Sequence, residues 1–134
     1  MDSRENAPPS STSLLVSLRQ QEAEVLARLQ PLLTEHQLLP EHWRILAVLD
    51  EHPGTSMTLL AATAVVPAAS LTRHVDRLVE RALVVRRIDP DDRRRTVLAL
   101  SPRGSAVARA LSSVEAGTGS TTSRDRAAGA RPLT

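Results

Sequence analysis

Two short stretches of this 134-residue chain carry side chains suited to hydrogen bonding with anions and base edges. The first presents small, hydroxyl, imidazole and guanidinium side chains at helical spacing: Ala69, Ser70, Thr72, Arg73, His74 and Arg77. The second holds an aspartate followed by three arginines: Asp92, Arg93, Arg94 and Arg95. A guanidinium group makes paired hydrogen bonds to phosphate oxygens or to a guanine edge. These ten residues are therefore the candidate binding residues.

The first stretch is expected to form a helix that opens at Pro67 and ends near Arg81. On a wheel of about 100° per residue, its apolar side chains form one stripe, while its arginines point to the opposite side. A short helix capped by Ser56 is expected to precede it over residues 57–64, joined to it by a tight connection at 65–66. This pattern predicts a helix-turn-helix whose second helix can enter a major groove.

The second stretch is expected to be the turn of a β-hairpin. Residues 83–89 and 95–100 are rich in Val, Ile, Leu and Thr, as strands are, and the Asp-Pro and Asp-Asp pairs between them favour a turn. A turn tip bearing arginines suits the narrow, strongly negative minor groove. We expect Asp92 to pair with one of these arginines and orient the loop. The predicted fold class is mainly α with a small β-hairpin wing, a winged helix-turn-helix with a helical dimerisation region.

The remaining elements frame this DNA-binding region. A long amphipathic helix is expected over residues 13–33, kinked or broken at Pro31, followed by a helix at 40–50 and a turn at 52–55. Ser101 and Pro102 are expected to open a last helix that ends at Val114. Polar composition predicts disorder for residues 1–12 and 115–134. The expected divisions are a dimerisation helix at 13–39, a DNA-binding domain at 40–101 and a shortened C-terminal helix at 102–114.

Charge is distributed unevenly along the chain, although the net charge is only +2. Residues 1–66 hold four arginines against eight acidic residues, whereas residues 67–110 hold ten against five. Positive charge thus coincides with the predicted DNA-binding elements, as capture of phosphate requires. There is no cysteine, which excludes disulfides and thiolate metal sites. With no long apolar run and no secretory signal, a cytoplasmic protein without membrane contact is expected.

These motifs together resemble the MarR family of bacterial transcriptional regulators. Residues 70–78, 83–87, 89–94 and 100–104 carry the resemblance, and residues 40–46 are similar to the family's second helix. The resemblance implies a homodimer on a pseudo-palindromic operator, with double-stranded DNA contacted by Ser70, Thr72, Arg73, Arg77 and Arg94. It also implies repression, with release of DNA when a small ligand binds. Three positions depart from the family pattern: Val65, Pro67 and Ala82.

The same resemblance places dimerisation on the first helix. We expect five of its apolar residues to form the interface: Leu14, Leu18, Val25, Leu29 and Leu32. Relatives normally add a long fifth helix and a sixth that interlock with the partner, where this sequence has a Gly/Ser/Thr/Arg-rich segment. Dimerisation is therefore expected to be weaker than in those relatives.

Other function classes are less well supported. His36, His42 and His52 with two nearby glutamates lack the spacing of a metal site, so neither a metal nor any other cofactor is expected. No phosphate loop, nucleophile motif or paired carboxylates predict an enzyme. The main alternative is a shortened interaction module that binds a full-length relative rather than DNA.

Overall fold

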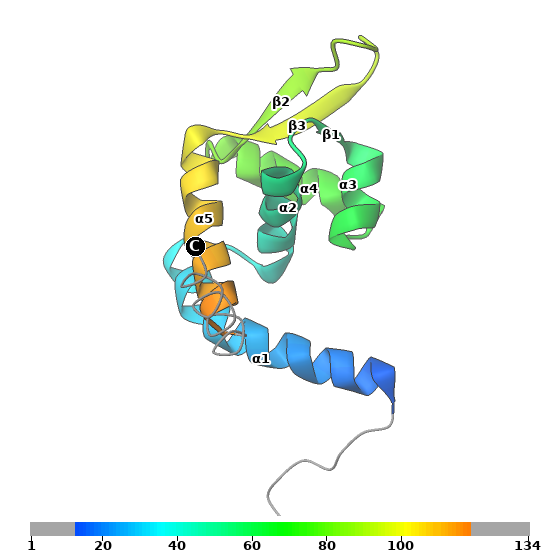
Figure 1. Ribbon diagram of the computed structural model, residues 1–134. Helices are drawn as coiled ribbons and strands as arrows, with labels where there is room; N and C mark the ends of the chain where they lie inside the picture. The colour runs from blue at the N-terminus through cyan, green and yellow to red at the C-terminus, as the bar shows by residue number, and fades with distance from the viewer. Residues whose placement is uncertain (1–12, 119–134) are drawn as a thin grey trace, which may run out of the picture.

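The computed structural model describes residues 13–118, which form five helices and three strands (Figure 1). In chain order these are α1 (Leu14–Glu35), α2 (Pro40–Glu51), β1 (Thr55–Ser56), α3 (Met57–Ala64), α4 (Ala68–Glu80), β2 (Val84–Ile88), β3 (Thr96–Leu100) and α5 (Pro102–Thr118). The predicted class of helices with a β wing is confirmed. The segments expected to be disordered, 1–12 and 119–134, lie outside the described residues.

Helix α1 is one continuous helix and corrects the expected break at Pro31. Its N-terminus is capped by Ser13, whose hydroxyl accepts a hydrogen bond from the Val16 amide at 3.3 Å. Pro31 lies inside the helix and leaves the Ala27 carbonyl without its usual donor. Both residues are exposed, so water can satisfy that carbonyl. The first turns of α1 extend away from the rest of the molecule, while its second half packs beside α5 (Figure 1).

The helix-turn-helix consists of α3 and α4. The Ser56 hydroxyl accepts from the Leu59 amide at 3.3 Å and so caps α3, as the sequence predicted. The turn that follows uses Val65 at φ 55°, a left-handed conformation that costs a β-branched residue about 1–2 kcal/mol. Pro67 is the N-cap of α4 rather than its first residue. Ala82, in the turn that follows α4, also has a left-handed conformation, at φ 59°.

The sheet has three antiparallel strands in the order β1-β3-β2, one more than the hairpin expected from the sequence. In the wing itself, Val84 pairs with Leu100 and Ile88 with Thr96, so both strands are slightly shorter than expected. Strand β1 consists of the last residue of the expected turn and the expected helix cap: Thr55 pairs with Leu98 and Ser56 with Val97. Two residues are too few to show strand periodicity, so this pairing had no signal in the sequence.

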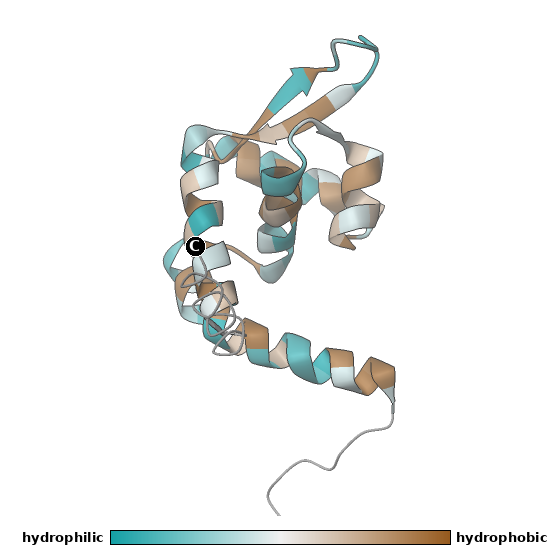
Figure 2. Cartoon of the chain, in the orientation of Figure 1, coloured by the Kyte–Doolittle hydropathy of each residue, from teal (hydrophilic) through white to brown (hydrophobic). Residues whose placement is uncertain are grey.

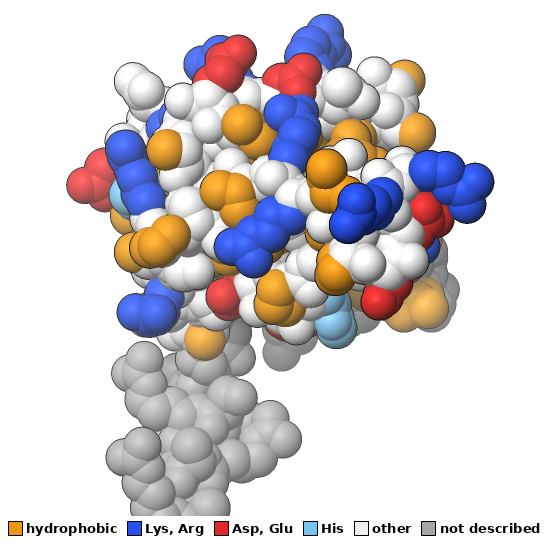
Figure 3. Space-filling model, turned by 90° about the horizontal axis from the view of Figure 1, so that it is seen from above, with side chains coloured by type: hydrophobic (Ala, Val, Ile, Leu, Met, Phe, Trp, Pro, Cys, Tyr) orange, Lys and Arg blue, Asp and Glu red, His pale blue; other side chains and the backbone are white. Residues whose placement is uncertain are grey.

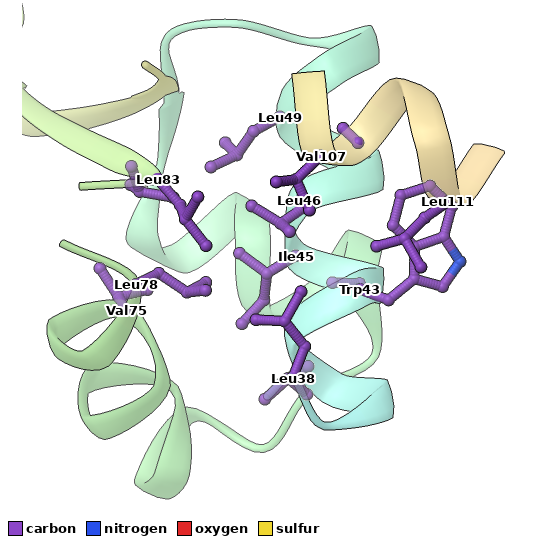
Figure 4. Packing of buried hydrophobic residues seen from close by; sticks show 14 of the residues in the cluster. Leu38, Trp43, Ile45, Leu46, Leu49, Val75, Leu78, Leu83, Val107 and Leu111 are labelled. Carbon is purple, nitrogen blue, oxygen red and sulfur yellow. The ribbon is translucent and has the colours of Figure 1, made fainter. Parts of the chain in front are cut away.

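One hydrophobic core joins the helices to the base of the wing (Figure 4). Helix α2 lies at its centre and contributes Trp43, Ile45, Leu46 and Leu49. From the surrounding elements, α4 adds Leu71, Val75 and Leu78, and α5 adds Val107, Ala108 and Leu111. Periodicity predicted these three residues of α4 as part of the buried stripe. Val79, also predicted there, is half-buried, whereas Ala82 lies beyond the end of the helix and is exposed.

Helix α5 begins against the base of the wing and runs farther than expected. Ser101 donates to the Ala82 carbonyl at 2.6 Å and accepts from the Gly104 amide at 2.9 Å. A Cβ at Gly104 would lie 1.9 Å from the Leu83 carbonyl oxygen, so only glycine permits this approach. The helix continues to Thr118, which corrects both the expected end at Val114 and the expected disorder of 115–118.

The extension of α5 has a physical reason in the core. The Trp43 indole donates to the Glu115 carboxylate at 2.8 Å, which gives a buried N–H group a charged acceptor on the last turns of α5.

None of the helices within residues 13–118 has the length and apolar character that a membrane span requires. The same residues contain no cluster of three potential metal ligands.

Candidate nucleic-acid interface

Helix α4 presents most of the predicted binding residues to solvent. Ala69, Thr72, Arg73 and Arg77 are exposed, opposite the buried stripe that packs on the core. Ser70 is half-buried, and its hydroxyl donates to the Pro67 carbonyl at 3.2 Å. This bond fixes the Ser70 side chain in the first turn, with its oxygen still able to accept. The outer face of α4 therefore offers small and hydroxyl side chains followed by two free guanidinium groups.

His74 is the predicted residue whose environment differs most from expectation. It is half-buried and packs edge-on against His42 of α2, with the ring centroids 5.0 Å apart. His74 Nδ1 lies 3.2 Å from His42 Nε2. Burial, the neighbouring His74 and the more distant Arg81 and Arg77 lower the pKa of His42 from 6.5 to about 4, against an opposing effect of Glu41. His42 is therefore neutral at physiological pH.

The C-terminal end of α4 is tied to the corner between α1 and α2. Arg81 donates to the carbonyl of Gln37 at 2.6 Å and also to the carbonyl of His36. Gln37 itself adopts a left-handed conformation at φ 56°. One guanidinium group thus satisfies two carbonyls at the end of α1 and fixes the end of α4 beside them. This contact had no signal in the sequence, because the bonded residues are 44 and 45 positions apart.

The wing tip is organised by its aspartates, as predicted for Asp92. The Asp92 carboxylate accepts from the Arg94 amide at 3.0 Å and from Arg94 Nε at 3.3 Å. Asp89 accepts from the Asp91 amide at 2.9 Å, while its other oxygen lies 3.9 Å from Arg95 Nε. The Arg94 side chain remains 91% exposed despite its partner. The loop is held by local bonds while its guanidinium groups stay available.

An ion pair that the sequence analysis missed joins the helix to the wing. Asp76 on α4 accepts a hydrogen bond from Arg86 on β2. Both side chains are partly exposed, so the pair contributes modestly to stability. The pair links α4 to β2, and so joins the two elements that carry the predicted binding residues. Figure 3 looks onto the wing end of the molecule, where arginine side chains spread across the face with acidic groups between them.

The five predicted dimerisation residues do not share one environment. Leu14 and Leu18 are 73% and 51% exposed, in the part of α1 that extends from the body (Figure 2). Val25 and Leu32 are half-buried. Leu29 is only 1% exposed and packs in the chain's own core, so it leaves no apolar surface for a partner. The exposed apolar surface is therefore concentrated in the first turns of α1, where Leu15 and Val16 add to it.

A cavity of about 480 Å³ lies between α1, α2 and the end of α3. Its walls are mostly apolar, and its charged lining residues are Arg44, Glu22 and Glu115. The Arg44 guanidinium donates to the carbonyls of Ala64 at 2.9 Å and of Val65 at 3.1 Å. The cavity wall is thus bonded directly to the turn that precedes α4.

Comparisons with known proteins agree with this arrangement. A family model described as the MarR family matches residues 36–95. The homoprotocatechuate degradative operon repressor of Escherichia coli is 30% identical over 95 residues, which cover 71% of this chain and 64% of the repressor. The chain therefore spans slightly less than two thirds of the length of this relative.

Solved structures show the same fold. NadR in complex with 4-hydroxyphenylacetate gives a TM-score of 0.75 at 24% identity, covering 95% of this chain and 94% of NadR. The repressor CouR, bound to a 23-mer DNA duplex, gives 0.67 at 23% identity and covers 95% and 96%. The arginine-bearing α4, the wing tied to it by Asp76 and Arg86, and these relatives lead to one conclusion. The chain has the winged helix-turn-helix fold of the MarR family, whose model matches its residues 36–95.

Proposed function

We propose that this protein is a sequence-specific DNA-binding transcriptional regulator that acts as a repressor. The observation that carries the proposal is that the exposed arginine face of α4 and the arginine-bearing wing lie on one body, linked by the ion pair between Asp76 and Arg86. A rigid pair of cationic elements suits adjacent grooves of one duplex better than separate charged segments would. The relatives named as repressors support this role over that of an enzyme or an interaction module.

In the proposed complex α4 enters a major groove. Arg73 and Arg77 contact base edges or phosphates, while Ala69, Ser70 and Thr72 allow close approach and add hydrogen bonds. The wing places Arg93, Arg94 and Arg95 at the flanking minor groove, with Arg94 oriented by Asp92. We assign base reading to α4 and mainly electrostatic contacts to the wing.

The proposed active form is a cytoplasmic homodimer on a pseudo-palindromic operator. The exposed leucines and valine in the first turns of α1 form an apolar surface that a second copy of the chain would cover. Two copies related by a twofold axis would present two α4 helices to successive major grooves of a pseudo-palindrome. Burying this surface in a dimer is also favourable, because it removes several large apolar side chains from water.

A small aromatic acid is the effector class that we propose. The cavity between α1 and α2 is mostly apolar, and its one guanidinium group, Arg44, suits a carboxylate. Of the two carboxylates that also line it, Glu115 accepts a hydrogen bond from Trp43 and Glu22 lies 3.5 Å from Arg19. NadR was solved with 4-hydroxyphenylacetate, which is a molecule of this class. A carboxylate that binds Arg44 would compete with the Ala64 and Val65 carbonyls and so disturb the turn before α4. Release of DNA would follow from that disturbance.

DNA selection tests the proposal directly. A duplex recovered from a random-sequence library with the wild-type protein is compared with a scrambled duplex at several salt concentrations. We expect the selected duplex to bind at least about a thousandfold more tightly, and to contain an inverted repeat. Equal affinity for both duplexes would overturn the proposed function. 4-Hydroxyphenylacetate should weaken binding by the wild type and have less effect on Ala47→Phe, which narrows the cavity.

A further inference from the structure

Three groups form a directional chain of hydrogen bonds from the start of α2 to the middle of α4. The backbone amide of Leu39 donates to His42 Nδ1 at 2.9 Å. His42 Nε2 lies 3.2 Å from His74 Nδ1. His42 is only 2% exposed, so both of its ring nitrogens depend on these partners.

The proton positions along this chain follow from the donor at its start. A backbone amide can only donate, so His42 Nδ1 must carry a lone pair and the proton of the neutral ring is on Nε2. That N–H donates to His74, whose Nδ1 must then also carry a lone pair. The remaining proton of His74 is therefore on Nε2. In the part of the chain that the structure describes, this Nε2–H group has no hydrogen-bond partner.

The surroundings of His74 favour an anion. His74 lines a hollow of about 430 Å³ together with Gln37, Leu39, His42, Arg73 and Arg77. Among these lining residues two carry guanidinium groups and none is a carboxylate. The hollow borders the outer face of α4, where a groove edge would bring the DNA backbone close. A phosphate oxygen there would meet two cations and one neutral N–H donor.

We propose that His42 is a positioning residue for DNA binding, which holds His74 in the form that donates from Nε2 to a backbone phosphate. The inference rests on the proposed function and adds to it a residue that lies too deep to touch DNA. A buried imidazole that fixes the tautomer of a second one acts as the partners of metal-bound histidines do. An added proton on either Nδ1 would place two N–H groups face to face and break this series of hydrogen bonds. The lowered pKa of His42 keeps its ring neutral and the hydrogen bonds intact at physiological pH.

The tautomers are measured first, on the full-length protein without DNA. Long-range ¹H–¹⁵N spectra at pH 7 should show both His42 and His74 protonated on Nε2 alone. In His42→Leu, His74 should populate both tautomers, whereas the exposed His52 should keep its spectrum. A wild-type His74 that is protonated on Nδ1, or exchanges between tautomers, would overturn the inference whatever the protein does with DNA.

DNA binding is measured next, with the duplex selected by the wild type. His74→Leu and His42→Leu should each lose about tenfold or more in affinity, the size of one hydrogen bond from a neutral donor to a charged phosphate, and the double variant should lose no more than either. The salt dependence should stay unchanged, because a neutral donor releases no counterion, whereas Arg94→Ala in the wing should lower the slope by about one. This contrast separates a positioning role from a general loss of structure.

His42→Gln and His52→Gln complete the set. The glutamine oxygen can accept from the Leu39 amide while its NH₂ group donates to His74, so His42→Gln should bind within about twofold of wild type. His52→Gln is the matched surface control and should also bind normally. If His42→Leu binds as tightly as wild type while His74→Leu is weakened, the positioning role is wrong. If the wild type binds no duplex at all, the proposed function and this inference fail together.

Discussion

Acidification should destabilise this protein through His42, by an amount that can be worked out from its surroundings. Burial beside His74, and near Arg81 and Arg77, lowers the pKa of His42 from 6.5 to about 4 in the folded chain. Below pH 6.5 the unfolded chain binds a proton at this residue, and the folded chain does not until about pH 4. The free energy of unfolding must therefore fall with pH across that window. Above pH 6.5 both states are neutral at this residue and it adds no slope.

The magnitude follows from the proton linkage. At about 1.4 kcal/mol per tenfold difference in proton affinity, the interval from pH 7 to pH 4 corresponds to about 3 kcal/mol from this residue alone. That is a large part of the stability expected for a domain of this size. Carboxylates and other histidines also titrate in this range, so the total for the protein does not isolate His42. The difference between the wild type and His42→Gln isolates the contribution of His42, because glutamine keeps the hydrogen bonds and cannot titrate.

Urea denaturation at half-unit steps from pH 7 to pH 4 measures this difference. The wild type should lose about 3 kcal/mol more than His42→Gln over the interval, with most of the loss between pH 6 and pH 4.5. His52→Gln is the control for the substitution at an exposed histidine, whose side chain is 65% exposed. Parallel curves for wild type and His42→Gln would refute the argument, and would mean that His42 is protonated in the folded chain.

Four further outcomes are expected. Arg73→Ala should cost about 1–3 kcal/mol of discrimination between the selected and scrambled duplexes with no change in melting temperature; unchanged discrimination would reassign the outer face of α4. Replacing the three wing arginines 93–95 with alanine should weaken binding to both duplexes by similar factors and lower the salt slope; loss confined to the selected duplex would contradict a mainly electrostatic wing. Val65→Gly should raise the free energy of unfolding by up to about 1 kcal/mol, because glycine adopts φ 55° without strain; a loss of stability in urea would mean that the valine makes a compensating contact. Leu18→Glu should shift the protein towards monomer in sedimentation velocity across a dilution series; a dimer indifferent to this change would place the interface elsewhere.

The sequence was sufficient where the signal is local. The stripe of Leu71, Val75 and Leu78 predicted which face of α4 is buried, because helical period and hydrophobicity act within a few residues. Ser56 predicted the start of α3 for the same reason, since a cap bonds three residues ahead. The pairing of Asp92 with Arg94 is also local. In all three cases the residues that determine the structure are separated by four positions or fewer in the sequence.

The sequence was insufficient where partners are distant. His42 and His74 are 32 positions apart, and Trp43 and Glu115 are 72 apart. Neither pair follows from periodicity, because both depend on how α2 packs against the rest of the chain. The end of α5 was misplaced for this reason: its last residues have a weak helical composition, but Glu115 accepts a hydrogen bond from the core. Composition describes a segment alone, and a buried polar partner can override it.

Three consecutive residues of α2 show why this helix matters for the function of the whole fold. His42, Trp43 and Arg44 are about 100° apart around the helix axis, so each faces a different element. His42 bonds to α4, Trp43 to α5, and Arg44 to the turn between α3 and α4. The last two also line the cavity beside α1. A shift of α2 by a fraction of a turn would disturb all three contacts at once. A ligand in that cavity would therefore reach α4 through contacts that α2 already makes with the turn before it.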